Sequence, residues 1–440
     1  MELNLRFPDG FVWGAATSSY QIEGAAAEDG RGPSVWDTFS HTPGKVRGGD
    51  TGDVAAGHYH LLSEDLDLMA ALALRSYRFS ISWSRVLPEG TGQVNQKGLD
   101  FYRRLVDGLH ARGIRPLATL FHWDLPQALQ DKGGWENRDC ALWFADYAQT
   151  VFDALDVADW GTINEPKTVV EAGYQMGVHA PGITDPARSY VALHHLHLAH
   201  GLAAQALHAL HPGRRIGPAL NLSPVYPADD GDAAREQAHL YDGLENRIYL
   251  DPILLGRYPD DMMEWIARRS PMPRHVLDGD LAVIAEPVDL LGVQYYNPKY
   301  VDGAGRRVFK HPVAQAEWLE IHPEGLYDIL VRLHRDYPAV PLRITENGLP
   351  TTDAPGPDGR VRDTGRIAYH RDHLAAMHRA MAEGVPVEGY HAWSLLDNFE
   401  WAEGYSQRFG LVYVDFETQR RTPKDSALWY RDLIRRGVLR

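Results

Sequence analysis

The chain has 440 residues, 44% of them hydrophobic, and a formal net charge of −15, which allows a large core and excludes a strongly basic nucleic-acid-binding surface. One cysteine, Cys140, rules out an intrachain disulfide and is typical of a reducing compartment. No signal-peptide pattern opens the sequence and no uncharged stretch approaches the ~20 residues of a membrane helix, so we expect a cytoplasmic protein without a nucleic-acid or membrane partner.

Eight short apolar runs predict strands. They are residues 11–16, 76–81, 115–121, 158–163, 215–220, 288–295, 341–345 and 387–394. The stretches between them have helical periodicity, as in Leu99, Tyr102, Leu105, Val106 and Leu109. Strict alternation of strand and helix predicts parallel strands, and eight such units predict a closed α/β barrel of the (β/α)8 type.

No linker, low-complexity tract or repeat interrupts this alternation, so residues 1–440 are predicted to form a single barrel domain. A Pro/Gly-rich stretch, residues 353–359, is expected to be a surface loop.

Reactive and aromatic side chains gather where the predicted strands end. They are Gln21, Arg78, His122, Trp123, Asn164, Glu165, Asn221, Tyr296, Glu346, Trp393, Glu400 and Trp401. The connections from helix to strand hold turn residues instead, such as Gly113 and Gly213. Barrel enzymes build their active sites at the C-terminal ends of the strands, so this asymmetry predicts a site there.

Two of these residues are glutamates in equivalent places. Glu165 ends a strand that Pro166 cannot continue, and Glu346 ends another before an Asn-Gly turn. One explanation is structural: the two carboxylates are unrelated, and each caps a helix or pairs with an arginine. The other is catalytic: two carboxyl groups at one end of a barrel are the smallest set that can supply both acid/base and nucleophilic catalysis at a glycosidic bond.

Aromatic and polar neighbours favour a sugar as the ligand. Indole rings such as Trp393 stack on the apolar face of a pyranose, and amide, imidazole and carboxylate groups match its hydroxyls. A dinucleotide site is disfavoured because no Gly-rich phosphate loop follows the first strand. His197 and His200 have a spacing that a metal site can use, but no local Asp or Glu completes it, so we expect no metal.

Six motifs resemble those of family 1 glycoside hydrolases. They are FVWGAATSSYQIEG at 11–24, YRFSISW at 77–83, HWDLP at 122–126, TINEP at 162–166, ITENG at 344–348 and WSLLDNFEW at 393–401. They occur in the family's order across essentially the whole chain. The resemblance implies a (β/α)8 barrel and a retaining exo-β-glycosidase, most often a β-glucosidase that removes terminal β-D-glucosyl residues without a cofactor.

The resemblance also implies roles for individual residues. Glu165 matches the acid/base, Glu346 the nucleophile, Arg78 and Tyr296 the pair that holds the nucleophile ionised, and Asn164 the ligand of the sugar 2-hydroxyl. The other residues predicted to bind substrate are Gln21, His122, Trp123, Asn221, Gln294, Trp318, Trp393, Glu400, Trp401 and Phe409.

Charge then predicts the mechanism. Retention requires carboxyl groups roughly 5–5.5 Å apart. At that range ionised Glu346 raises the pKa of Glu165, which can therefore donate a proton, while Arg78 lowers the pKa of Glu346. Once Glu346 is esterified its charge is gone, the pKa of Glu165 falls, and Glu165 becomes the base that activates water.

Two positions depart from the family pattern. Gln294 stands where the family usually has Asn, and Leu319 stands where it usually has Trp, with Trp318 one residue earlier. Preference for the leaving group is therefore not carried over from the family.

Several alternatives stay open. A 6-phospho-β-glycosidase is disfavoured because Glu400 would repel a phosphate, and a non-catalytic sugar-binding relative is disfavoured because both glutamates are present. The choice among glucose, galactose and fucose, the leaving-group size, the transglycosylation tendency and the oligomeric state are not predicted.

Overall fold

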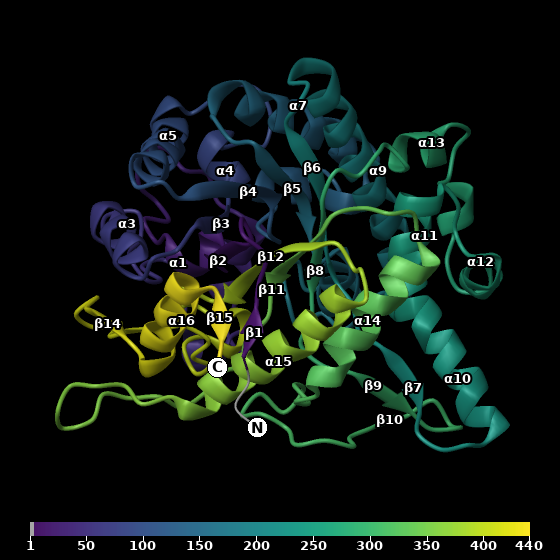
Figure 1. Ribbon diagram of the computed structural model, residues 1–440. Helices are drawn as coiled ribbons and strands as arrows, with labels where there is room; N and C mark the ends of the chain where they lie inside the picture. Colours follow the sequence, from purple (N-terminus) through teal and green to yellow (C-terminus); the bar gives the residue numbers. More distant parts are fainter. Residues whose placement is uncertain (1–3) are drawn as a thin grey trace.

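The computed structural model describes residues 4–440, and its centre is a closed barrel of eight parallel strands (Figure 1). Neighbours around the barrel follow the chain order, and the last strand closes on the first. The strands are β2 (Val12–Ala16), β3 (Ser76–Ser80), β4 (Arg115–Phe121), β5 (Asp159–Asn164), β6 (Arg215–Asn221), β8 (Leu291–Gln294), β11 (Leu342–Glu346) and β12 (Val387–Trp393). The predicted fold class is thus confirmed.

The predicted strand boundaries lie close to the observed ones, except at β8. The apolar run predicted a strand over residues 288–295, whereas β8 begins only at Leu291. The reason is Asp289, whose carboxylate accepts the backbone N–H of Ile216 at 3.0 Å. A side chain here takes the place of a ladder carbonyl, so regular pairing begins after it.

Long helices form a ring outside the strands (Figure 1). They are α3 (Leu62–Ala71), α5 (Gln96–Ala111), α7 (Asp139–Ala154), α9 (Pro186–Leu210), α11 (Ile248–Leu255), α14 (Pro323–Asp336), α15 (Thr364–Ala382) and α16 (Asp425–Arg436). On α5 the five residues predicted at helical spacing are all buried, which confirms that this face packs against the barrel. Within residues 4–440, no helix has both the length and the apolar character that crossing a membrane requires.

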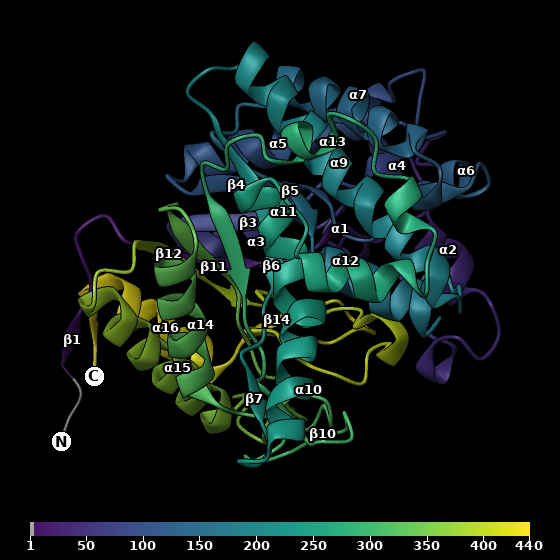
Figure 2. The same ribbon diagram turned by 90° about the vertical axis from the view of Figure 1, so that its right-hand side faces the viewer.

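Further helices and strands lie in the connections between the barrel strands and in the segments before the first and after the last of them. The helices are α1 (Ser19–Ile22), α2 (Val35–Ser40), α4 (Trp83–Val86), α6 (Gln127–Gln130), α8 (Pro166–Thr168), α10 (Asp232–Asp242), α12 (Asp260–Ala267) and α13 (Asp280–Ile284). The small strands are β1 (Leu5–Arg6), β7 (Val225–Pro227), β9 (Lys299–Val301), β10 (Arg307–Val308), β13 (Val412–Val414), β14 (Arg421–Pro423) and β15 (Val438–Leu439). Sheet β10-β9-β7 and α10 lie together beside the barrel (Figure 2), and β1 pairs with β15 next to both chain ends.

Candidate active site

Glu165 and Glu346 both lie at the C-terminal ends of barrel strands. Glu346 is the last residue of β11, and Glu165 follows β5 directly. Glu165 has a left-handed backbone with φ of +45°, and Trp123 and Trp401 also have positive φ, at +76° and +51°. Non-glycine residues rarely adopt this conformation, and such strain concentrates at functional sites.

The turn after Glu346 depends on its neighbours. Asn347 donates to the carbonyl of Tyr295 at 2.7 Å, and its own side-chain oxygen accepts from Tyr390 at 2.7 Å. Gly348 lies so close to β12 that a Cβ there would come within 1.8 Å of the Trp393 carbonyl oxygen. Only glycine allows this approach, which brings the end of β11 next to Trp393.

Glu346 is held by a cation and a hydroxyl. Arg78 donates to Oε1 at 2.5 Å and Tyr296 donates to Oε2 at 2.8 Å, with all three side chains buried. Burial raises the pKa of Glu346, and Arg78 opposes this. The expected direction of the Arg78 effect is confirmed, although burial gives a net increase. Arg78 favours the ionised form of Glu346 over that of its neighbours.

Glu165 has no such support. Its Oε2 accepts a hydrogen bond from Thr168 at 2.7 Å, and no lysine or arginine forms an ion pair with it among residues 4–440. Burial and the charge of Glu346 raise the pKa of Glu165 to about 8. The protonated form of Glu165 is therefore favoured at neutral pH, and the two glutamates differ in what holds them.

Asn164 joins the two sides of the site. Its side-chain oxygen accepts from Arg78 at 2.5 Å and from Gln294 at 2.7 Å, so the longer stem of Gln294 still reaches it. Its amide nitrogen lies 3.1 Å from His122 Nε2, and Trp123 donates to its carbonyl oxygen at 2.9 Å. Burial, helped by Arg78, holds the pKa of His122 well below its usual value, so the ring is neutral and can accept.

Glu400 lies on the opposite side of the site. Gln21 donates to Glu400 at 3.3 Å and to Asn398 at 3.0 Å. Burial and the charges of Glu346 and Glu165 raise the pKa of Glu400 to about 8. Of these three carboxyl groups, Glu346 is the one that Arg78 contacts, so Arg78 favours ionisation of Glu346 over ionisation of the other two.

Indole rings surround these polar groups. His122 stacks against Trp401 and Trp393, with ring centroids 6.0 and 5.9 Å apart and planes within 18° and 17°. Trp123 packs on Trp401 at 4.6 Å. The aromatic residues predicted to bind a ring therefore come together, although they derive from the ends of two strands, β4 and β12, that are far apart in the chain.

The predicted substrate-binding residues Trp318 and Phe409 flank Tyr296. Their rings approach it edge-on at 5.7 and 6.4 Å. Trp318 is 44% exposed, whereas Leu319 is fully buried against the Phe409 cluster. Compared with the family pattern, the indole is thus one residue earlier in the sequence, and it faces outward. Asn221 ends β6 beside Gln294 and is partly exposed.

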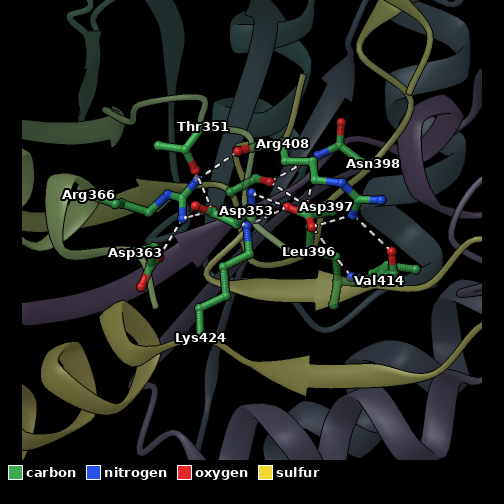
Figure 3. A network of polar contacts seen from close by, with 12 residues as sticks. Thr351, Asp353, Asp363, Arg366, Leu396, Asp397, Asn398, Arg408, Val414 and Lys424 are labelled. Carbon is green, nitrogen blue, oxygen red and sulfur yellow. Dashed lines mark hydrogen bonds and ion pairs between the residues drawn. The ribbon is translucent and has the colours of Figure 1, made fainter. Parts of the chain in front are cut away.

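A buried network of ion pairs holds the segment after β12 (Figure 3). Lys424 donates to both Asp353 and Asp397 at 2.9 Å, and Arg366 binds Asp353 at 2.7 Å. Arg408 binds Asp397 at 2.7 Å. Because Asp397 lies three residues before Glu400, the network fixes the segment that presents Glu400. The prediction of a surface loop over residues 353–359 agrees with the structure, where the segment is irregular and mostly exposed, although the carboxylate at its first residue, Asp353, turns inward to these cations.

Some residues at the site were not predicted. Thr168 binds Glu165, Asn398 accepts a hydrogen bond from Gln21, and the half-buried His179 packs against Trp123. Asn398 lies inside the motif at 393–401, so its position in the sequence could have indicated that it belongs to the site. Thr168 and His179 carry no pattern that distinguishes them in a single sequence.

The histidines of α9 are engaged in hydrogen bonds within the protein. Their partners are the hydroxyl of Tyr258 for His194 and His197, the Trp135 carbonyl for His195 and Thr162 for His200. Across the described part of the chain, no three His, Cys, Asp or Glu side chains are arranged to hold a metal ion.

A parallel eight-stranded barrel with two buried glutamates at its strand ends, one of them bound by an arginine, among indole rings defines the class of (β/α)8 glycoside hydrolases. The chain belongs to glycosyl hydrolase family 1, whose family model matches residues 3–438. The resemblance seen in the sequence is confirmed, and the chain is a glycoside hydrolase.

Two sequence relatives and one solved structure show how similar the chain is to members of the family. β-Glucosidase A of Acetivibrio thermocellus is 46% identical over 443 residues, covering 98% of both chains. A bifunctional β-D-glucosidase/β-D-fucosidase of Bifidobacterium breve is 45% identical over 461 residues, covering 98% of this chain and 99% of the other. A family 1 β-glucosidase from Thermotoga maritima in complex with isofagomine lactam superposes with a TM-score of 0.95 at 45% identity, covering 99% of this chain and 100% of that structure.

Proposed function

We propose that the chain is a retaining exo-β-glucosidase that hydrolyses terminal β-D-glucosyl residues of short oligosaccharides, such as cellobiose, and of aryl or alkyl glucosides. The observation that carries this proposal is the unequal support of the two glutamates. Glu346 is bound by Arg78 and Tyr296, whereas Glu165 is bound by the Thr168 hydroxyl and has a pKa raised to about 8 by burial and by Glu346.

In the first step the Glu346 carboxylate attacks the anomeric carbon. The bond to the leaving oxygen breaks, and Glu165 gives that oxygen its proton. In the second step Glu165, now ionised, takes a proton from water. The water oxygen attacks the anomeric carbon and displaces Glu346, so two inversions return the β-anomer.

Unpaired polar atoms support sugar binding. His122 Nδ1 and Gln294 Oε1 are buried and have no hydrogen-bond partner among residues 4–440. Sugar hydroxyls are groups that can satisfy both. The proposed substrate-binding residues are Gln21, His122, Trp123, Asn164, Asn221, Gln294, Tyr296, Trp318, Trp393, Glu400, Trp401 and Phe409, with catalysis by Glu165 and Glu346 and support from Arg78, Tyr296 and Asn164.

A β-fucosidase or β-galactosidase preference is the second candidate. The similarity to the bifunctional enzyme of Bifidobacterium breve favours testing it. Glu400 disfavours a 6-phosphorylated sugar, because any negative charge on its carboxyl group repels a phosphate.

We also propose that residues 1–440 act as one catalytic barrel domain in the cytoplasm. One hydrophobic cluster that extends along the chain from Phe7 to Leu439 supports a single domain, and the lone Cys140 fits a reducing compartment.

A panel of p-nitrophenyl β-glycosides tests the sugar preference. We expect the glucoside to have the highest kcat/KM and the 6-phosphoglucoside to be cleaved far more slowly. Proton NMR of the first-formed sugar should show the β-anomer before mutarotation. Initial α-anomer would exclude double displacement, and preference for the phosphorylated substrate would exclude the proposed role of Glu400.

A further inference from the structure

A buried charged cluster lies directly behind Glu165. The short helix α8 runs into a π-helical segment, Val169–Gln175, and a second π-helical segment is formed by Gly243–Arg247. Lys167, on α8 and two residues beyond Glu165, meets Glu245 on the second π-helical segment. π-Helical turns are rare and occur frequently at functional sites, and here one directly follows α8 while the other supplies the partner of Lys167.

Contacts within the cluster are direct and buried. Lys167 Nζ donates to Glu245 Oε2 at 2.8 Å, and Lys299 from β9 pairs with the other carboxylate oxygen. Lys167 is 4% exposed and Glu245 is 3% exposed. Although burial opposes ionisation, the two ammonium groups lower the pKa of Glu245 to about 2. The Lys167–Glu245–Lys299 triad therefore carries a net positive charge.

Glu171 belongs to the same cluster but differs from Glu245. Burial and the charge of Glu245 raise the pKa of Glu171, which disfavours a second negative charge beside the triad. Burying a net charge costs free energy that apolar side chains of the same size would avoid. A role in packing alone does not account for this arrangement.

We propose that Lys167, held by Glu245 and Lys299, is a positioning residue for the acid/base carboxyl of Glu165. The proposal rests on the function proposed above. The triad fixes the chain after Glu165, so that Thr168 keeps its hydroxyl on the carboxyl. It also places a positive charge behind Glu165 without an ion pair, so the proton stays transferable.

That charge matters most in the second step. When Glu346 is esterified, it no longer opposes ionisation of Glu165, but burial still does. Lys167 and Arg78 favour the carboxylate form of Glu165, and Lys167 stands on the segment that begins at Glu165 itself. The positive charge thus helps Glu165 remain ionised until it takes a proton from water. The titratable or charged groups around Glu165 and the triad are Arg78, Lys167, Glu171, Glu245, Tyr249, Tyr296, Lys299, Arg307, Glu346 and Glu400.

Removing a positive charge and removing a negative charge from the triad should shift the pH dependence of activity in opposite directions. The readout is the alkaline limb of kcat/KM for a phenyl β-glucoside, whose poor leaving group needs the proton of Glu165. Lys167→Met removes positive charge and should move this limb up by about 0.5–1 pH unit. Glu245→Gln removes negative charge and should move it down. A merely structural role would lower activity without shifting the limb in opposite directions.

A second readout isolates the second step. With a dinitrophenyl glucoside, whose first step scarcely needs a proton, we expect Lys167→Met to lower kcat about 5–20-fold through slower hydrolysis of the glycosyl-enzyme. Lys167→Arg keeps the charge and should restore both the limb and kcat. If Lys167→Met does not fold, Lys299→Met and Glu245→Gln test the same signs within the triad.

Arg343→Met is the matched control, since it removes a buried, ion-paired cation at the other end of the barrel. It should lower stability and leave the alkaline limb in place. An unmoved limb in Lys167→Met, or shifts of one sign in both triad variants, would overturn the proposal. Failure of the proposed function itself would appear separately, as a wild-type alkaline limb that Glu165→Gln does not abolish.

Discussion

The two ends of the barrel use buried charge differently. At the N-terminal end, Arg343 binds Asp159 at 2.8 Å and Glu388 at 3.1 Å, and Arg215 binds the same two carboxylates at 2.9 Å each. Each carboxylate there meets two guanidinium groups. Although burial opposes ionisation, these contacts lower the pKa of Asp159.

At the C-terminal end, the number of carboxyl groups exceeds the number of arginines that contact them. Glu165, Glu346 and Glu400 share Arg78, and burial raises the pKa of all three. The same scaffold thus pairs its buried carboxylates with cations at one end and, among the residues that the structure describes, leaves Glu165 and Glu400 without an arginine partner at the other, where perturbed pKa values are typical of functional sites. Four predictions can break or sharpen this comparison.

Glu346→Ala should have the largest effect on the C-terminal end. Without a nucleophile no glycosyl-enzyme can form, so kcat/KM for aryl glucosides should fall by about 10⁴-fold or more. Added azide should attack the substrate directly and give the α-glycosyl azide, identified by NMR. A variant that kept wild-type turnover would exclude Glu346 as the nucleophile.

Glu165→Ala should cost about 10²–10⁴-fold in kcat/KM for a phenyl glucoside, because the leaving oxygen receives no proton. With a dinitrophenyl glucoside the first step should survive and the second should stall. Intact-mass spectrometry should then detect a covalent sugar on Glu346, and azide should release the β-glycosyl azide. The same anomer from both variants would contradict the assignment.

Asp159→Ala should destabilise the N-terminal end of the barrel without changing the catalytic activity. It leaves Arg343 buried and half-paired, so the free energy of unfolding should fall by about 3 kcal/mol in denaturant titrations. At temperatures where the variant stays folded, kcat/KM should match the wild type. A large loss of kcat/KM in the folded variant would show that the two ends are not independent.

Glu165→Gln sharpens the comparison through pH. A carboxyl whose folded pKa is raised binds more protons folded than unfolded, so it lowers stability as pH rises from its ordinary value to about 8. The variant lacks this loss, so its Tm should exceed that of the wild type by a few degrees near pH 8 and by less near pH about 5. Asp159 has the opposite sign, because its stabilisation is present above its ordinary pKa and is lost as pH falls through the lowered value. A Tm difference that did not grow with pH would contradict a raised pKa for Glu165.

Much of this arrangement could be predicted from the sequence. Strand ends are marked by local features, such as Pro166 after Glu165 and Gly348 after Asn347, and the barrel topology then brings distant strand ends together. The pairing of Glu346 with Arg78 and Tyr296, far apart in the chain, was implied by the resemblance to family 1 glycoside hydrolases and not by a local pattern.

The rest depends on contacts that no local pattern encodes. β8 is shorter than predicted because the Asp289 side chain accepts the backbone N–H of Ile216. The carboxylate of Asp353 points inward from its loop because the buried Lys424 donates to it. The net rise in the pKa of Glu346 was missed because it depends on burial, which a sequence does not give. The two π-helical segments were missed since their apolar spacing resembles that of ordinary helices.

The pairing of β1 with β15 determines where an attachment to either end of the chain would emerge. These strands lie near Phe11, Arg75 and Arg115, where barrel strands begin, and Figure 1 shows β1 beside β15. A bead, electrode or fusion partner linked there would therefore sit on the far side of the barrel from Glu165 and Glu346. Immobilisation through either terminus should leave the site turned toward the bulk solution. A short peptide bridging the two ends would also allow new termini to be opened elsewhere in a circular permutant.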